Sequence, residues 1–154
     1  MSCLYMLKQS TAAPKGRGSS LRILKLGLSA IRSITEVREA FSFGIDHIDV
    51  LINIAGEISP LVPATETTAK DFLAAFELDS IEPLLVFQAL WLPLQKSLSP
   101  KLIMVTSSVG SIAEIEPMPG GSYGPSKTAQ NWLRRALHLE NKDCGLITIT
   151  LHPG

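Results

Sequence analysis

Hydrophobic residues along the chain form two kinds of pattern, short runs typical of buried strands and longer stretches with a helical period. The two kinds alternate from the N-terminal third to the end of the chain. Strands are predicted at residues 21–26, 47–53, 101–106 and 146–151, and helices at residues 33–43, 68–97 and 123–141. This order predicts an α/β fold in which a parallel sheet carries helices on both faces.

Local signals indicate where these helices begin and end. Ser33 and Thr68 are each followed three residues later by an acidic residue, which is the spacing of a capping box. Pro83 and Pro93 fall inside the second predicted helix and should break or bend it. Gly145 follows the third helix and favours its end there.

The first 20 residues have a different composition. They contain Pro14, Gly16 and Gly18 without any hydrophobic period, and they are predicted to form a loop or a disordered tail. Residues 21–154 are predicted to form one domain, because a chain of 154 residues can bury a sizeable core.

Charge and cysteine content exclude several classes of function. The 14 basic and 14 acidic residues cancel, so no broad surface for nucleic acid or anionic lipid is expected. The longest uncharged run covers residues 83–95 and is shorter than the ~20 apolar residues of a membrane span. Cys3 and Cys144 make neither a disulfide framework nor a metal site. We therefore expect a cytoplasmic protein without a nucleic-acid, membrane or metal partner.

Polar and small residues follow the predicted strands at the edge where such sheets bind ligands. Asn53-Ile-Ala-Gly56 follows the second strand, Thr106-Ser-Ser108 the third, and His152-Pro-Gly154 the last. Taken singly, each has an ordinary interpretation as a turn, loop or cap. Their joint order favours a binding site.

Tyr123 and Lys127 lie four residues apart and therefore project from one helical face. An ammonium close to a phenol favours the phenolate. A serine hydroxyl in the same cleft could hold a carbonyl oxygen while the phenol exchanges its proton. This chemistry suits interconversion of a carbonyl and an alcohol with hydride from a nicotinamide cofactor. A surface pair on a helix is the alternative.

In this order the residues resemble the short-chain dehydrogenase/reductase family, which carries Asn-Asn-Ala-Gly, then a serine, then Tyr-x-x-x-Lys and Pro-Gly. The resemblance covers residues 15–154. Residues 82–88, 116–119 and 123–127 are similar to a fungal ketoreductase branch that includes norsolorinic acid ketoreductase-like enzymes of polyketide metabolism. The resemblance implies a partial Rossmann-type, doubly wound parallel sheet that lacks the first two strands and the C-terminal segment.

The resemblance also implies catalytic roles. Tyr123 matches the catalytic acid and base, and Lys127 matches the residue that favours the phenolate and holds the nicotinamide ribose. Ser108 matches the serine that orients the substrate, a small carbonyl or alcohol. The distance from this serine to the tyrosine is two residues longer than usual, so Ser107 remains an alternative.

Cofactor contacts are implied at two further segments. Asn53, Ala55 and Gly56 match the segment that lines the adenosine part, and Pro153 and Gly154 match the turn beside the nicotinamide. The ketoreductase branch suggests NADP, with NAD as the alternative.

The chain departs from the family pattern in its phosphate loop and its helices. It has no glycine-rich turn after a first strand, and Gly16-Arg-Gly18 is only a partial match, so poor cofactor binding by this chain alone is expected. Ile54 replaces the second asparagine of the family motif. Asp79 replaces an asparagine of the long helix, where a carboxylate would oppose formation of the Tyr123 phenolate.

These departures leave a second hypothesis open. The chain could be a non-catalytic, truncated family remnant, or a fragment of a gene model, that associates through its long helices. The apolar residues that could serve such an association, with core burial as the alternative, are Trp91, Leu94, Trp132 and Leu139.

Overall fold

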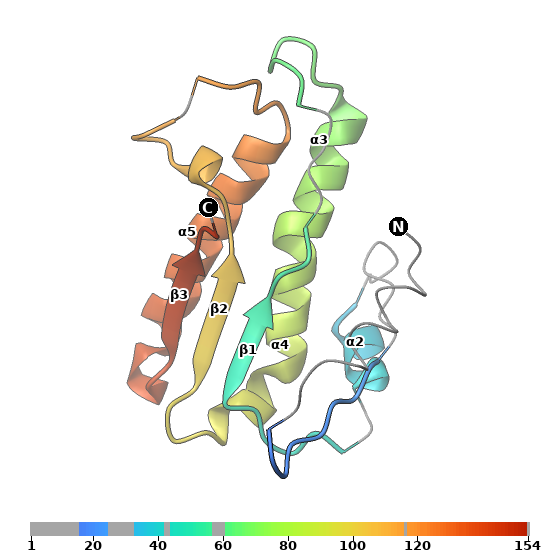
Figure 1. The fold of residues 1–154 in the computed structure, drawn as a ribbon, viewed down its shortest axis with the longest axis vertical. Coiled ribbons are helices and arrows are strands. Elements are labelled where there is room, and N and C mark those ends of the chain that lie inside the picture. Colours follow the sequence, from blue (N-terminus) through green and yellow to red (C-terminus); the bar gives the residue numbers. More distant parts are fainter. Residues whose placement is uncertain (1–15, 25–32, 42–43, 57–60, 116, 154) are drawn as a thin grey trace.

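Three parallel strands form the centre of the computed structural model, which describes residues 16–24, 33–41, 44–56, 61–115 and 117–153. The strands are β1 (Val50–Asn53), β2 (Lys101–Val105) and β3 (Ile147–Leu151), and they lie in the order β1-β2-β3. All three point the same way, so their carboxyl ends meet at the upper edge in Figure 1. This confirms the predicted α/β class with a parallel sheet.

The described residues include four α-helices beside the sheet: α2 (Ile34–Ala40), α3 (Ala69–Phe76), α4 (Glu82–Gln95) and α5 (Tyr123–Asn141). A π turn, Glu77–Ile81, joins α3 to α4, and short 3₁₀ turns occupy Ser108–Gly110 and Lys142–Cys144. The bounds of α5 are those that the hydrophobic period predicts. The connection from each strand to the next runs through a helix, as parallel strands require.

The helix ends match the capping signals predicted from the sequence only in part. Ser33 and Glu36 form the complete, reciprocal capping box at the start of α2. Thr68 accepts a hydrogen bond from the backbone N–H of Asp71, but its own hydroxyl donates to the Asp71 carboxylate at 2.6 Å. In this second capping box the reciprocal bond therefore joins the two side chains of Thr68 and Asp71. Gly145 adopts the left-handed conformation (φ 76°) that ends a helix, after one 3₁₀ turn beyond α5.

The two prolines of the long helical region behave differently. Pro83 lies in the first turn of α4, directly after the π turn. Pro93 lies inside α4, which continues past it to Gln95. The chain therefore stays helical past both prolines, and its irregular part is the π turn just before Pro83.

The core lies between the sheet and the helices behind it (Figure 1). Leu102 and Met104 of β2 are fully buried, and they pack with side chains of α4, α5 and the start of β3. Val37 of α2 belongs to a second cluster with Val86 and Leu90 of α4. The long helices α4 and α5 thus pack on one face of the sheet, and the start of α5 lies at the carboxyl edge of the strands.

The opposite face of the sheet is open among the described residues. On the edge strands of this face, the apolar side chains between 42% and 49% exposed are Val50, Ile52, Ile147, Ile149 and Leu151. The sequence predicts helices on both faces of the sheet. In the described part of the chain, helices cover one face.

The predicted strand at residues 21–26 is wrong for residues 21–24, which are irregular and partly exposed; residues 25 and 26 lie outside the described residues. A strand needs a neighbour for its backbone hydrogen bonds, and within the described part of the chain β1 is an edge strand that pairs with β2 alone. Residues 16–20 form an exposed turn, as predicted, whereas residues 1–15 are not described.

The four apolar residues considered for association divide between core and surface. Leu94 is fully buried and Trp91 packs against the core. Trp132 (72% exposed) and Leu139 (53% exposed) lie on the outer side of α5. None of the helices in the described ranges is long and apolar enough to cross a bilayer.

Candidate functional site

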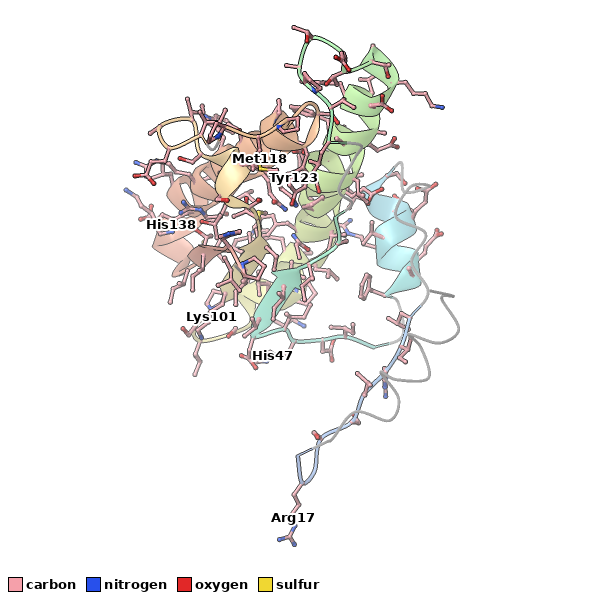
Figure 2. All side chains as sticks on the ribbon, turned by 45° about the horizontal axis from the view of Figure 1, so that its top comes forward. Arg17, His47, Lys101, Met118, Tyr123 and His138 are labelled. Carbon is pink, nitrogen blue, oxygen red and sulfur yellow. The ribbon has the colours of Figure 1, made fainter. Side chains whose placement is uncertain are left out.

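Tyr123 lies at the carboxyl edge of the sheet, where α5 begins. Figure 2 shows it at the end of the molecule opposite Lys101 and His47, which lie near the amino ends of the strands. Tyr123 therefore lies at the edge of the sheet where the sequence analysis expects a ligand to bind.

The 3₁₀ turn that carries Ser108 is fastened to α5. The carbonyl oxygen of Gly110 accepts hydrogen bonds from Thr128 (3.1 Å) and Asn131 (3.2 Å). One turn earlier in α5, the helix passes close to the same segment: a Cβ on Gly124 would stand 3.3 Å from the Val109 carbonyl oxygen. This packing holds Ser108 beside the first turn of α5. Ser107 precedes the turn, and both serines are half-buried.

Lys127 is buried and directed toward Tyr123. Its Nζ lies 5.4 Å from the centroid of the Tyr123 ring, within the range of a cation–π contact. The same atom lies 3.4 Å from Gln130 Oε1 and 3.5 Å from the Val105 carbonyl oxygen at the end of β2. The two residues of the Tyr-x-x-x-Lys motif therefore share one buried face of α5.

Asp79 completes this cluster from the π turn. Its carboxylate is fully buried and forms an ion pair with Lys127, with 3.0 Å between Oδ1 and Nζ. The Ser126 hydroxyl donates to Oδ2 at 2.6 Å and has the Tyr123 carbonyl oxygen as a second acceptor at 2.8 Å. The carboxylate expected near Tyr123 thus contacts the lysine directly.

The segment after β1 reaches the same cluster. A Cβ on Gly56 would lie 3.0 Å from Asp79 Oδ1 and 3.1 Å from Lys127 Nζ, so glycine allows the chain to pass tightly against these two groups. Asn53, the last residue of β1, is buried, and its Nδ2 lacks a hydrogen-bond partner among the described residues. The unpartnered amide suits the approach of a polar group to this edge.

Other predicted cofactor residues are less closely tied to the cluster. Ala55 is exposed between Asn53 and Gly56, and Pro153 is exposed just after β3. Gly154 lies outside the described residues. The structure therefore joins Gly56, Tyr123 and Lys127 in one place, with Ser108 on the adjoining turn.

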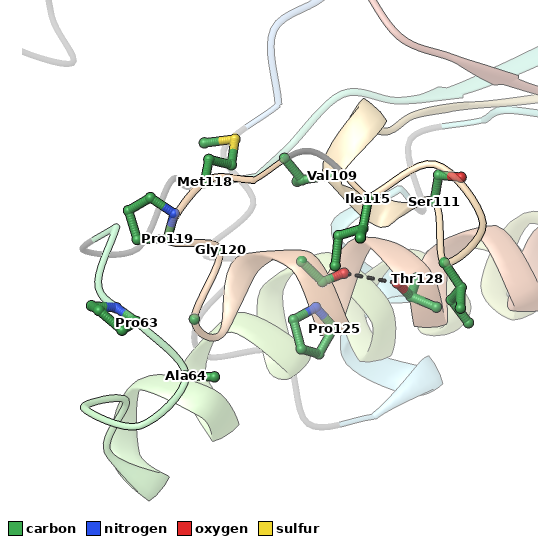
Figure 3. A pocket seen from close by; sticks show the side chains of 13 residues that line it. Pro63, Ala64, Val109, Ser111, Ile115, Met118, Pro119, Gly120, Pro125 and Thr128 are labelled. Carbon is green, nitrogen blue, oxygen red and sulfur yellow. Dashed lines mark hydrogen bonds between the residues drawn. The ribbon is translucent and has the colours of Figure 1, made fainter.

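A cavity of about 710 Å³ opens next to the site (Figure 3). Val109 and Gly124, the sequence neighbours of Ser108 and Tyr123, both line it. None of its described lining residues is charged, and the Thr128 hydroxyl is already bonded to main-chain carbonyl oxygens. The remaining described lining residues are Pro63, Ala64, Ser111, Ile112, Ile115, Met118, Pro119, Gly120, Gly121 and Pro125.

A second cavity, of about 500 Å³, runs along the free edge of β1 and is bordered by Glu82 of α4. The Glu82 side chain is almost fully buried, and neither carboxyl oxygen has a hydrogen-bond partner within the described ranges. Burial raises the pKa of Glu82 to about 7, and the nearby acidic residues Glu77 and Asp79 add to this rise.

The free energy of unfolding should therefore fall as the pH rises from the ordinary pKa of Glu82, 4.5, to its raised pKa of about 7. The unfolded chain releases the Glu82 proton near the ordinary pKa of 4.5, whereas the folded chain keeps it until about 7. Between these values the unfolded state binds fewer protons, so a higher pH favours unfolding. Urea unfolding from about pH 5 to about pH 8 measures the effect. Glu82→Gln should flatten the profile, while Glu66→Gln, at an exposed position, should not. Parallel profiles for the wild type and Glu82→Gln would contradict this assignment.

Three residues of this region were not identified from the sequence. Ser126 and Gln130 flank Lys127 on α5, and Gln130 lies three residues beyond it on the same helical face. Glu82 stands three residues after Asp79 and begins an otherwise apolar stretch. Helical spacing from Lys127 and Asp79 could have indicated Gln130 and Glu82, and Ser126 stands three residues after Tyr123.

Comparison with known proteins gives a consistent result. The model of the family described as short chain dehydrogenase matches residues 6–154. Short-chain dehydrogenase srdF of Neurospora crassa is 37% identical over 152 residues, which cover 96% of this chain and 59% of that protein. Norsolorinic acid ketoreductase stcE of Emericella nidulans is 31% identical over 151 residues, covering 93% of this chain and 56% of its own length.

The solved structures agree. The NADPH-bound carbonyl reductase from chicken fatty liver superposes with a TM-score of 0.79 at 28% identity, covering 98% of this chain and 62% of that chain. The chain therefore spans less than two thirds of the length of these relatives.

Proposed function

The chain belongs to the short-chain dehydrogenase family, and from this premise we propose that its protein transfers hydride between a nicotinamide cofactor and a ketone or alcohol. The observation that carries the proposal is the pairing of the half-buried Tyr123 with the buried Lys127, whose Nζ lies 5.4 Å from the centroid of the phenol ring. Proton transfer by a positioned phenol is the part of this chemistry that the chain itself supplies.

Each residue of the cluster has one role in the proposed reaction. Ser108 donates a hydrogen bond to the carbonyl oxygen of the substrate, and Tyr123 gives its phenolic proton to that oxygen as the alcohol forms. Lys127 favours the resulting phenolate through its positive charge. The nicotinamide, when bound, supplies the hydride that the carbonyl carbon receives.

Several described residues suit cofactor contacts. The Asn53 amide group is buried without a hydrogen-bond partner among the described residues, and Lys127 lies next to both Gly56 and Tyr123. We propose that Lys127 holds the nicotinamide ribose and that Asn53, Ala55 and Gly56 line the adenosine part. NADPH is the proposed form, supported by the relation to a carbonyl reductase whose structure carries NADPH.

The proposed substrate is an uncharged, largely apolar ketone. The support is the cavity beside Ser108 and Tyr123, which has a volume of about 710 Å³ and no charged residue in its described lining. A charged substrate would lose hydration there without gaining an ion pair. The similarity to a norsolorinic acid ketoreductase favours an aromatic ketone of polyketide type.

Oxidation of NADPH by the protein expressed from its own gene tests this proposal. An apolar aromatic ketone should be reduced, and an anionic keto acid of similar size should be reduced at least about tenfold more slowly, because its carboxylate meets no cation in the cavity. NADH in place of NADPH provides the cofactor comparison. Failure to reduce any ketone with either cofactor, or a preference for the keto acid, would refute the corresponding part of the proposal.

A further inference from the structure

The Lys127 ammonium is enclosed by oxygen atoms of the protein itself. The side chain is 4% exposed, and Nζ lies 3.0 Å from Asp79 Oδ1, 3.4 Å from Gln130 Oε1 and 3.5 Å from the Val105 carbonyl oxygen. A lysine ammonium has three hydrogens. Gln130 Oε1 and the Val105 carbonyl oxygen accept hydrogen bonds from Nζ, whereas Asp79 Oδ1 is held at ion-pair distance by its charge. A further acceptor therefore has to compete with these three oxygens for the ammonium.

Asp79 is the most strongly attracting of the three acceptors, because it alone is charged. It is fully buried, and the Ser126 hydroxyl holds its other oxygen at 2.6 Å. Ser80, the next residue of the π turn, donates to the Ser126 carbonyl oxygen at 3.1 Å. The Ser126 hydroxyl therefore holds the carboxylate against the ammonium, whereas the Ser80 bond joins the π turn to α5 without contacting the carboxylate.

We propose that Asp79 is a positioning residue that clamps Lys127, and that Asp79 competes with the ribose hydroxyls of a nicotinamide cofactor for the same ammonium hydrogens. The inference rests on the proposed function, because it concerns the residue assigned there to the ribose. To hold a ribose, Lys127 has to turn its hydrogens away from Asp79, which then keeps only the bond from Ser126.

The balance of this competition disfavours the cofactor. A carboxylate binds an ammonium through its charge as well as through hydrogen bonding, whereas a ribose hydroxyl is neutral. A buried carboxylate that loses its cation is also left uncompensated. The substitution Asp79→Asn keeps the shape and a carbonyl oxygen toward Lys127, but it removes the charge that holds the ammonium.

Two measurements on the protein expressed from its own gene test the clamp. In ¹⁵N-labelled protein, the Lys127 ammonium hydrogens should exchange slowly with water, and Asp79→Asn should speed this exchange by about tenfold or more. Lys127→Met identifies the signal by its absence. Asp79→Asn should also tighten NADPH binding by about ten- to a hundredfold, followed by the fluorescence of the cofactor.

Ser80→Ala is the matched control, because it removes a hydroxyl bond from the same π turn and leaves Asp79 in place. It should behave like the wild type in both measurements. If Asp79→Asn binds NADPH no more tightly than Ser80→Ala, or if its Lys127 hydrogens exchange as slowly as in the wild type, the proposal is wrong.

Ketone turnover separates this inference from the proposed function. Tighter NADPH binding by Asp79→Asn, with no ketone reduced by any variant, would support the clamp and refute the proposed function. Ketone reduction by the wild type, with unchanged NADPH affinity in Asp79→Asn, would refute the clamp and leave the proposed function standing.

Discussion

Replacing Tyr123 by phenylalanine should lower the rate of ketone reduction by about 10²- to 10⁴-fold, the usual contribution of a positioned general acid. The substitution removes only the phenolic oxygen, which is the proposed proton donor, and keeps the ring that packs within cation–π distance of Lys127. Steady-state kinetics of the protein expressed from its own gene measure the loss, which should fall on kcat.

Binding and stability serve as the internal controls for Tyr123→Phe. NADPH affinity should change by about twofold or less, because ribose binding is assigned to Lys127 and the phenyl ring remains beside it. The urea midpoint should also stay close to that of the wild type. A variant that keeps a comparable turnover rate would show that another group supplies the proton, and the proposed mechanism would be wrong.

Periodicity was enough to predict most of the described elements because these elements bury a regular face. The α5 helix has the predicted bounds, and β2 alternates between buried and half-buried residues as a strand packed on one face does. The i, i+4 relation of Tyr123 and Lys127 was equally visible, since both residues belong to one helix. Features of this kind depend only on neighbours in the sequence.

Features that depend on distant parts of the chain were not predictable in the same way. Residues 21–24 alternate like a strand, yet a strand forms only where another strand offers hydrogen bonds. The sequence showed Asp79 as an unusual carboxylate, but its ion pair with Lys127 depends on the π turn and on the packing of that turn against α5. Neither the π turn nor the crossing of two helices has a period that the sequence reveals.

The same distinction applies to Gly110, whose importance is visible only in the packing. The chain makes a close approach there, between the Ser108 turn and α5. Substitution by alanine would place a Cβ 2.9 Å from both the carbonyl carbon and the Cβ of Lys127, and 3.0 Å from the amide nitrogen of Asn131. The first two atoms belong to a helix that is fixed by its own hydrogen bonds, so the 3₁₀ turn has to move away.

Gly110→Ala should therefore lower the free energy of unfolding by about 2–3 kcal/mol, as overpacking of a tight contact does. For a domain of this size the midpoint of thermal unfolding should fall by about 5–10 °C. Turnover should fall as well, because the displaced turn carries Ser108 away from Tyr123. Gly120→Ala makes the same chemical change where the nearest atoms are 3.9 Å away, and it should leave stability unchanged or slightly raised. Equal stability of the two variants would mean that the Ser108 turn can shift without loss, and that its attachment to α5 does not position the serine.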